Sequence, residues 1–127
     1  ILMNYEVAPL VLYSQDRTRM LNFMSDVFEF EVNNKDYSVH CGGLYFQIEN
    51  NEQNLNQATD NRVMFSFRID SLDELDEIIN KYNFFRYRRD GSAFSENFEN
   101  GENEIEKYVI IYDLDARPWK FFYKKDA

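Results

Sequence analysis

The sequence has little that would support a disulfide framework, a membrane span or a nucleic-acid interface. Its 127 residues include a single cysteine, Cys41, so no disulfide can form within the chain. No apolar run approaches the roughly 20 residues that cross a bilayer, and no secretory signal pattern is present. Basic residues number 14 against 23 acidic ones, and the net charge of −9 repels phosphate backbones. We therefore expect no nucleic acid, no membrane partner, and a reducing, cytoplasmic setting.

Aromatic side chains, in contrast, are abundant. The chain has 12 Phe and 9 Tyr, and hydrophobic residues make up 44% of it. Disordered chains are poor in aromatic residues, whereas a chain of this length can bury a core without covalent cross-links. Because domains most often have about 100–150 residues, we expect residues 1–127 to form one domain. The acidic balance favours solubility over a tuned attraction for a cationic ligand.

The first half predicts a β-α-β-β-β order over about residues 4–49. Residues 5–14 are apolar and β-branched, which is typical of a strand, but Pro9 cannot donate to a ladder, so the strand lies at an edge or starts there. Asp16 is a candidate N-cap for a helix over 18–28, where apolar residues recur at helical spacing. Three short alternating segments then predict strands: 28–32, 37–40 and 44–48, with a Gly42-Gly43 turn before the last.

The second half repeats this order over about residues 62–125, after a polar, Asn-rich linker at 50–61. A strand is expected at 62–69. Ser71 and Glu74 have the spacing of a capping box at the start of a helix. The remaining expected elements are strands at 84–88, 107–112 and 118–123, a mobile loop at 92–106 and a turn at 113–117.

Three stretches resemble the vicinal oxygen chelate superfamily, which includes glyoxalase I, extradiol dioxygenases, fosfomycin-resistance proteins and bleomycin-resistance binders. They are PLVLYSQD with MLNFMSDVFEFEV in the first module, VMFSFRIDSLDEL at the start of the second, and YDLDARPWKFFY at its end. The resemblance implies an α+β fold in which two tandem βαβββ modules form a curved, mostly antiparallel sheet with helices on the convex face. It also implies a homodimer, since each small module leaves one sheet face uncovered.

Enzymes of this family hold a divalent metal on the concave face, with ligands from the first and last strands of each module. Aligning the turns places Pro9, Gln47, Met64 and Lys120 at those four positions. Proline and methionine cannot ligate a hard divalent ion, and Lys120 would repel one. Only Gln47 could serve. We therefore expect no metal and no cofactor, and we favour a protein that is not an enzyme.

Strand alternation places a set of candidate ligand-binding residues on the concave face. They are Tyr13, Tyr45, Gln47, Ser66, Arg68, Lys120 and Phe122. Their strand neighbours are expected in the helix-covered core: Leu10, Leu12, Phe46, Ile48, Phe65, Phe67, Ile69, Trp119 and Phe121. The aromatic candidates could stack on a flat or apolar ligand. Arg68 and Lys120 would offer positive charge, unless they point to solvent or pair with nearby carboxylates.

Four other polar residues have simpler interpretations. His40 and Cys41 are adjacent, so on a strand they face opposite ways and cannot share a metal. We expect His40 to be structural and Cys41 to be an inert, buried thiol. Asp113 and Asp115 lack the rest of a calcium loop and are interpreted as turn residues.

Three functions remain open at this point. The first is a non-catalytic small-molecule-binding protein of the glyoxalase/bleomycin-resistance type, acting in resistance or sequestration through a groove formed with a second subunit. The second is a divergent metal-dependent lyase or dioxygenase whose ligands lie elsewhere. The third is a regulatory or interaction module with an empty site. The ligand's charge stays open too, because the net charge suits a cation whereas Arg68 and Lys120 suit an anion.

Overall fold

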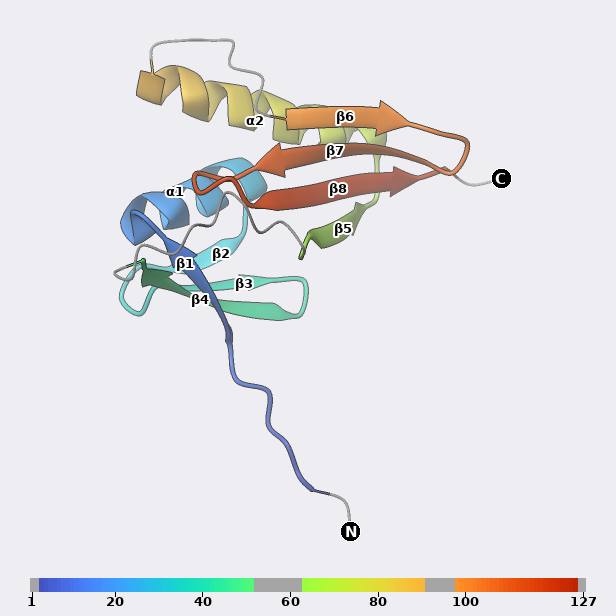
Figure 1. Cartoon of the computed structure of the whole chain (residues 1–127). Coiled ribbons are helices and arrows are strands. Elements are labelled where there is room, and N and C mark those ends of the chain that lie inside the picture. The colour runs from blue at the N-terminus through green and yellow to red at the C-terminus, as the bar shows by residue number, and fades with distance from the viewer. Residues whose placement is uncertain (1–2, 52–62, 91–97, 126–127) are drawn as a thin grey trace.

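The computed structural model describes residues 3–51, 63–90 and 98–125. Its elements are β1 (Leu10–Ser14), α1 (Arg17–Phe28), β2 (Glu31–Asn33), β3 (Ser38–Cys41), β4 (Leu44–Asn50), β5 (Phe65–Ile69), α2 (Leu72–Asp90), β6 (Phe98–Glu102), β7 (Glu106–Tyr112) and β8 (Pro118–Lys124) (Figure 1). The predicted α+β fold of two βαβββ modules is confirmed. Most of the expected linker at 50–61 lies outside the described residues. Neither α1 nor α2 is long and apolar enough to cross a membrane.

The strands form two four-stranded sheets, one in each module. Sheet A has the order β1-β4-β3-β2 and sheet B the order β5-β8-β7-β6. In each sheet the first and last strands of the module pair in parallel, and the other neighbours are antiparallel. Within the described residues no strand pairs across the two sheets, so one chain holds two separate sheets where the resemblance implied one.

Helix α1 begins and ends through local capping contacts. The carboxylate of Asp16 accepts a hydrogen bond from the Arg19 N–H at 3.2 Å, which confirms the predicted N-cap. The helix ends where Glu29 adopts a left-handed φ of 59° and its N–H bonds to the carbonyl of Ser25. The expected helix end at Phe28 is therefore confirmed, whereas the strand expected to start at the same residue begins only at Glu31.

Helix α2 is longer than the sequence predicted, and the strand expected at 84–88 is wrong. These residues form the last turns of the helix. The run FFRYR has a strand-like composition, but Tyr82 and Phe85 continue at helical spacing the buried face that Leu75 begins. Phe23 of α1 packs edge-on against the rings of Tyr82 and Phe85, with centroids 6.3 and 5.3 Å away. This tertiary packing outweighs the local strand propensity.

Strand β6 lies inside the segment that was expected to be a loop, 92–106, so that expectation is wrong for residues 98–102. All five residues pair with β7, from Phe98 opposite Ile111 to Glu102 opposite Lys107. The Phe98 ring packs edge-on against Tyr82 of α2, with centroids 5.9 Å apart. The pairing is that of a hairpin with the next strand, but FENGE has neither the β-branched composition nor the alternation that would have predicted a strand. Residues 92–97 lie outside the described part of the chain.

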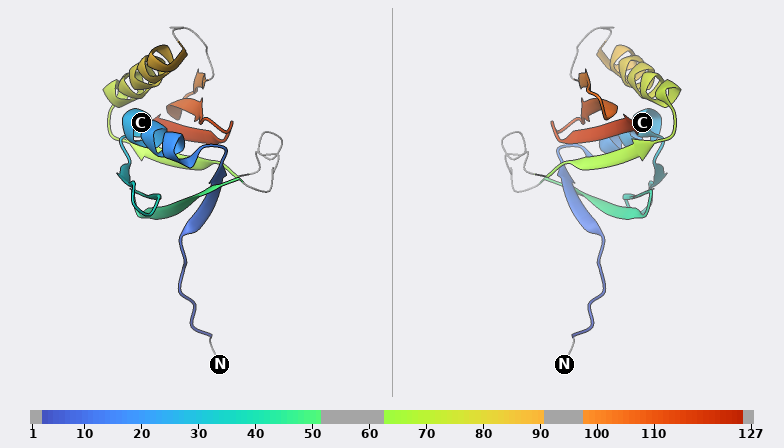
Figure 2. Two further views of the ribbon diagram at one scale, coloured as in Figure 1. Left: turned by 90° about the vertical axis from the view of Figure 1, so that its left-hand side faces the viewer. Right: turned by 90° about the vertical axis from the view of Figure 1, so that its right-hand side faces the viewer.

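The two modules share one hydrophobic core. Phe46 of sheet A lies 5.0 Å from Phe65 and 5.6 Å from Trp119 of sheet B, measured between ring centroids. Helix α1 packs on sheet A, α2 packs on sheet B, and the two helices contact each other (Figure 2). The inner sides of both sheets therefore face the same interior. We call the opposite side of each sheet its outer face. Leu10, expected in the core, is 44% exposed because β1 is the edge strand of sheet A.

The N-terminal residues 3–9 extend away from the body without regular structure (Figure 1). The strand expected over 5–14 therefore begins at Leu10, directly after Pro9. This start agrees with the inability of proline to donate a ladder hydrogen bond. The apolar side chains of Met3, Tyr5 and Val7 are exposed along this segment.

Candidate functional site

The outer face of sheet A carries three of the seven predicted site residues. Tyr45 and Gln47 point away from the core because Phe46, between them, points into it. Tyr13 lies on the same face, on the neighbouring strand β1. The Tyr45 ring stacks on His40 of β3, with centroids 4.3 Å apart. The side-chain amide of Gln47 donates to a backbone carbonyl in the β2–β3 turn, so its position is fixed.

The outer face of sheet B carries Lys120 and Phe122, since the residues between and before them point inward. The Lys120 ammonium donates to the carboxylate of Glu106 on β7 at 2.8 Å, and each side chain is 20% exposed. The ammonium also lies 4.8 Å from the Tyr108 ring centroid and 5.6 Å from that of Phe122. The interpretation that this cation pairs with a nearby carboxylate is confirmed for Lys120.

Ser66 and Arg68 stand beside these residues on β5. The parallel register sets Ser66 opposite Lys120 and Arg68 opposite Phe122. Both β5 side chains are exposed. Arg68 forms no ion pair with any residue that the structure describes. Among the candidate residues on the outer face of sheet B, Lys120 is therefore neutralised, Arg68 has no ion pair with a described residue, and Phe122 is aromatic.

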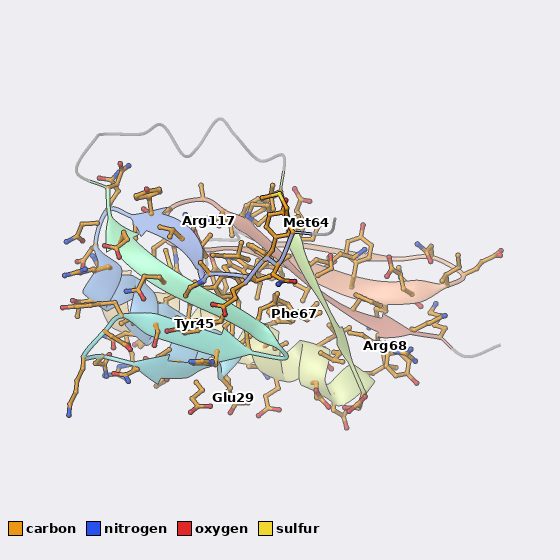
Figure 3. The ribbon with its side chains drawn as sticks, turned by 90° about the horizontal axis from the view of Figure 1, so that it is seen from below. Glu29, Tyr45, Met64, Phe67, Arg68 and Arg117 are labelled. Atoms are coloured by element: carbon orange, nitrogen blue, oxygen red, sulfur yellow. The ribbon has the colours of Figure 1, made fainter. Side chains whose placement is uncertain are left out.

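The two sets of candidates do not meet within one chain. Because the inner sides of the two sheets share a core, their outer faces point in different directions. Figure 3 shows Tyr45 on sheet A well separated from Arg68, near the far end of β5. The sequence alone assigned each residue to a face of its own strand. It did not reveal how the two sheets are oriented.

Sequence reasoning missed Glu106 and Tyr108, which complete the surroundings of Lys120. Glu106 was assigned to the end of a loop, and the faces of β7 were not assigned. The signal was nevertheless present, because the buried residues Val109 and Ile111 alternate with Tyr108 along this strand. Applying the two-residue period to β7 would have placed Tyr108 and Glu106 on the outer face with Lys120.

The position of the Tyr108 ring depends on a glycine. A Cβ atom at Gly101 would lie 2.5 Å from the ring. We expect Gly101→Ala to push the ring away from Lys120 and to lower the free energy of unfolding by about 1 kcal/mol. Urea denaturation measures the cost, and NMR should show smaller ring-current shifts on the Lys120 methylene protons. In a Tyr108→Leu background the same change should cost less, and an equal cost in both backgrounds would contradict the steric cause.

The four positions at which the resemblance places metal ligands do not form a metal-binding set here. Lys120 presents an ammonium ion-paired to a carboxylate, and the Gln47 amide is held by a backbone carbonyl. Pro9 has no donor side chain, and Met64 offers only an exposed thioether. No group of three His, Cys, Asp or Glu side chains that could hold a metal occurs in the described ranges. These residues do not fit the divalent ion of the family's enzymes.

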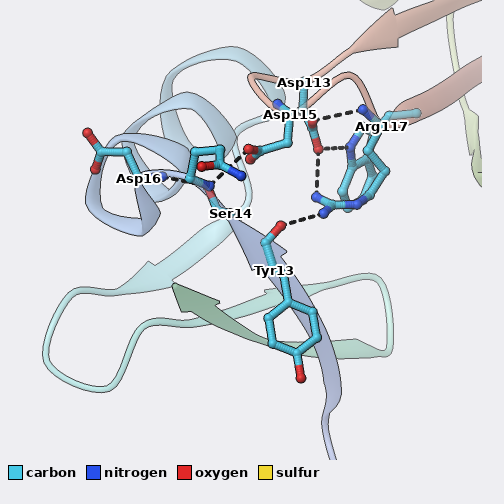
Figure 4. A network of polar contacts seen from close by, with 8 residues as sticks. Tyr13, Ser14, Asp16, Asp113, Asp115 and Arg117 are labelled. Atoms are coloured by element: carbon cyan, nitrogen blue, oxygen red, sulfur yellow. Dashed lines mark hydrogen bonds and ion pairs between the residues drawn. The ribbon is translucent and has the colours of Figure 1, made fainter. Parts of the chain in front are cut away.

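A buried polar network centres on Asp113 in the β7–β8 turn (Figure 4). Its carboxylate accepts hydrogen bonds from the Arg117 guanidinium and the Trp119 indole N–H, both at 2.9 Å, and from the Asp115 backbone N–H at 2.8 Å. Burial raises the pKa of Asp113, and the Arg117 charge and the N–H donors oppose that rise. The interpretation of Asp113 and Asp115 as turn residues is confirmed.

The same turn joins the two modules. The Arg117 guanidinium donates to the carbonyl of Tyr13 at 2.6 Å, and the Asp115 carboxylate accepts from the Gln15 N–H at 2.9 Å. Both acceptor–donor pairs connect the end of β1 with the loop before β8. The backbone that carries the candidate residue Tyr13 is thus held by module 2.

His40 and Cys41 face opposite ways, as predicted. His40 is exposed on the outer face of sheet A, and Cys41 is buried in the core. Burial raises the pKa of the Cys41 thiol to about 11. The reactive thiolate is therefore scarce near neutral pH, which agrees with the predicted inert thiol.

Comparison with known proteins identifies the fold and nothing finer. No family model and no curated protein sequence matches the chain. A hypothetical protein from S. aureus is similar with a TM-score of 0.73 and 18% identity, covering 95% of both chains. The fosfomycin resistance protein FosX from Listeria monocytogenes has a TM-score of 0.65 and 15% identity, covering 98% of this chain and 95% of its own. A lactoylglutathione lyase from Agrobacterium tumefaciens has a TM-score of 0.59 and 18% identity, covering 94% of each chain.

Proposed function

Because the chain has the fold of the vicinal oxygen chelate superfamily, we propose that it is a non-catalytic protein that binds a small molecule in a groove between two copies. The outer face of sheet A of one copy and the outer face of sheet B of the other supply the two walls of that groove. This arrangement brings Tyr13, Tyr45 and Gln47 opposite Ser66, Arg68, Lys120 and Phe122. The supporting observation is that, within the described residues, no element packs on either outer face, so a second copy would cover both.

One observation carries the proposal. Lys120, which the resemblance aligns with a metal ligand of the family's enzymes, is ion-paired with Glu106. Lys120 is bonded to Glu106 and flanked by the rings of Tyr108 and Phe122. A positive charge at this place opposes a divalent cation, and the surrounding rings favour an organic ligand. Binding without chemistry is the simplest activity of such a site.

The surroundings of Lys120 also narrow the ligand class. Since Glu106 neutralises Lys120, only Arg68 contributes an unpaired charge to this set of candidates. The aromatic side chains Tyr13, Tyr45 and Phe122 provide most of the remaining contact surface. We infer a flat, largely apolar ligand that is neutral or carries one negative charge, and a resistance or sequestration role that follows from binding alone.

Three measurements test this proposal together. Elemental mass spectrometry after incubation with zinc, nickel, manganese and iron should find no stoichiometric metal. Thermal-shift assays with a panel of aromatic monocarboxylates should find a stabilising compound, which at 100 times its Kd adds about 2.7 kcal/mol to the free energy of unfolding. Size-exclusion chromatography with light scattering should show a dimer.

Each contrary result points to a different alternative. Stoichiometric metal would favour the divergent lyase or dioxygenase. The absence of any stabilising compound would favour a regulatory module with an empty site. A monomer at micromolar concentration would remove the shared groove.

Lys120→Met is expected to weaken binding of the stabilising compound about tenfold, because it leaves the Glu106 carboxylate unpaired on the groove wall. Isothermal titration calorimetry measures the change. Lys35→Met is the matched control, since it removes the same charge from the exposed β2–β3 turn and should leave the affinity unchanged. Equal losses in both variants would mean that only the overall charge matters.

A further inference from the structure

A cavity of about 390 Å³ lies where the C-terminal end of α1, the β3–β4 turn, β5 and α2 meet. We call it the inter-module cavity, because both modules line it. Its walls include the core-facing side chains of Cys41, Phe67 and Phe121. These three side chains come from the inner sides of the sheets, whereas two other lining residues, Glu31 and His40, lie opposite each other on the outer face of sheet A. The cavity volume falls within the range of small-molecule sites, about 300–1,000 Å³.

Four phenylalanine rings form a closed circuit in the wall of this cavity. The centroid of Phe28 lies 5.2 Å from Phe30, Phe30 lies 5.4 Å from Phe67, Phe67 lies 5.5 Å from Phe121, and Phe121 lies 5.0 Å from Phe28. Phe28 and Phe121 are buried, whereas Phe30 and Phe67 are partly exposed. Ring faces carry partial negative charge and attract cations, most strongly where water is excluded.

Carboxylates gather around the same cavity. Glu29, Glu31, Glu74 and Glu77 line it, and Lys81 is the one Lys or Arg among its described lining residues. Lys81 is bonded to Glu29 and lies 3.4 Å from Glu77. Glu31 and Glu74 form no ion pair with a described residue. The lining thus holds four carboxylates against one ammonium, and the C-terminal end of α1 adds further negative potential.

We propose that the inter-module cavity binds an organic cation, an alkylated ammonium group carried on a small apolar skeleton. An alkylated ammonium is weakly hydrated, so aromatic walls can replace its water at small cost. Ile69, Ile78 and the four rings give the cavity an apolar lining suited to the skeleton, and Glu31 and Glu74 add carboxylates suited to its charge. A metal ion does not fit, because the described residues form no three-ligand group there. The cavity lining contains none of the seven candidate groove residues, and its one link to them is His40, which stacks on Tyr45.

Benzyltrimethylammonium is a suitable probe, with its neutral carbon isostere neopentylbenzene as the matched comparison. Titration followed by methyl NMR should give saturable shifts at Ile69 and Ile78, with Overhauser contacts from the N-methyl protons to both side chains. The isostere should bind at least about tenfold more weakly, since it lacks the cation–π and ionic attraction. Equal binding of the two compounds, or shifts confined to other residues, would overturn the proposal.

Variants separate local from general electrostatic attraction. Glu31→Gln with Glu74→Gln should weaken binding of the probe about threefold to tenfold. The control pair, Glu6→Gln with Glu104→Gln, removes the same charge from exposed residues outside the cavity and should leave the affinity unchanged. If the control pair lowers the affinity equally, the overall acidity of the protein explains the binding, and the proposed site is refuted.

A filling variant tests the location directly. Ile78→Trp should abolish binding of the probe while circular dichroism and thermal unfolding report a folded protein. If this variant fails to fold, Ile69→Met, which changes the wall without closing the cavity, should still change the probe's affinity. Lys120→Met should leave cavity binding intact, so failure of this site and failure of the proposed groove give different results. Retained binding in a folded Ile78→Trp protein would contradict the proposal.

Discussion

Replacing Trp119 with alanine is expected to lower the free energy of unfolding by about 3–5 kcal/mol. Trp119 is fully buried where the two modules meet. Its ring contacts five others: Phe28, Phe30, Phe46, Phe65 and Phe67. Because small proteins are stable by only about 5–15 kcal/mol in total, this loss is a large fraction of the free energy of unfolding. Urea denaturation followed by far-ultraviolet circular dichroism measures it, since the variant has no tryptophan left.

Phe84→Ala is the matched control for this prediction. It also removes a large aromatic side chain, but Phe84 is 62% exposed on α2. The expected loss is below about 1 kcal/mol. Similar losses in the two variants would mean that the shared core around Trp119 does not dominate stability. Trp119→Phe separates the two roles of the residue, because it keeps a ring and removes the indole N–H that donates to Asp113.

Asp113→Asn is expected to lower the free energy of unfolding by about 3 kcal/mol or more, because removing one partner of a buried ion pair is strongly destabilising. The Asp113 side chain is fully buried, and it holds the Arg117 guanidinium at 2.9 Å together with the indole of Trp119. An asparagine keeps the shape but supplies one acceptor oxygen and no charge. Urea denaturation again gives the measurement.

Glu104→Gln controls for the change in net charge. Glu104 is exposed in the turn between β6 and β7, and its replacement should alter stability by less than about 0.5 kcal/mol. A cost below about 1 kcal/mol for Asp113→Asn would show that solvent or neighbouring groups replace the lost interactions. It would also mean that the contacts of this turn contribute little to holding module 2 against β1.

The sequence predicted those parts of the fold that depend on neighbouring residues. The N-cap at Asp16, the apolar face of α1 and the Gly42-Gly43 turn all follow from local chemistry, and Gly42 and Gly43 do adopt positive φ angles of 51° and 94°. The errors occur where packing or pairing with another element decides. Phe85 is helical because it packs against α1, and β6 is a strand because β7 pairs with it. The strand at 107–112 was predicted, but FENGE carries no alternating pattern that would have marked it as the partner of that strand.

The candidate site divides in the same way. The period of two along a strand was enough to separate Lys120 and Phe122 from Trp119 and Phe121. The relative orientation of sheets A and B was not accessible, because it depends on packing of their inner sides around Phe46 and Trp119. The sequence analysis allowed for Lys120 to pair with a nearby carboxylate. It did not name Glu106, because it did not determine which residues of β7 point to the outer face.

The contacts between β1 and the β7–β8 turn also bear on how the chain folds during synthesis. The Gln15 N–H bonds to a carboxylate that is 100 residues further along the chain. Closing so long a loop is slow, and such non-local pairings lengthen folding times. The ribosome must therefore release the chain as far as Asp115 before the end of β1 can form this hydrogen bond. Nascent chains that end before the β7–β8 turn cannot form this contact. The first strand of the fold therefore reaches its final state only after the turn before the last strand has been synthesised.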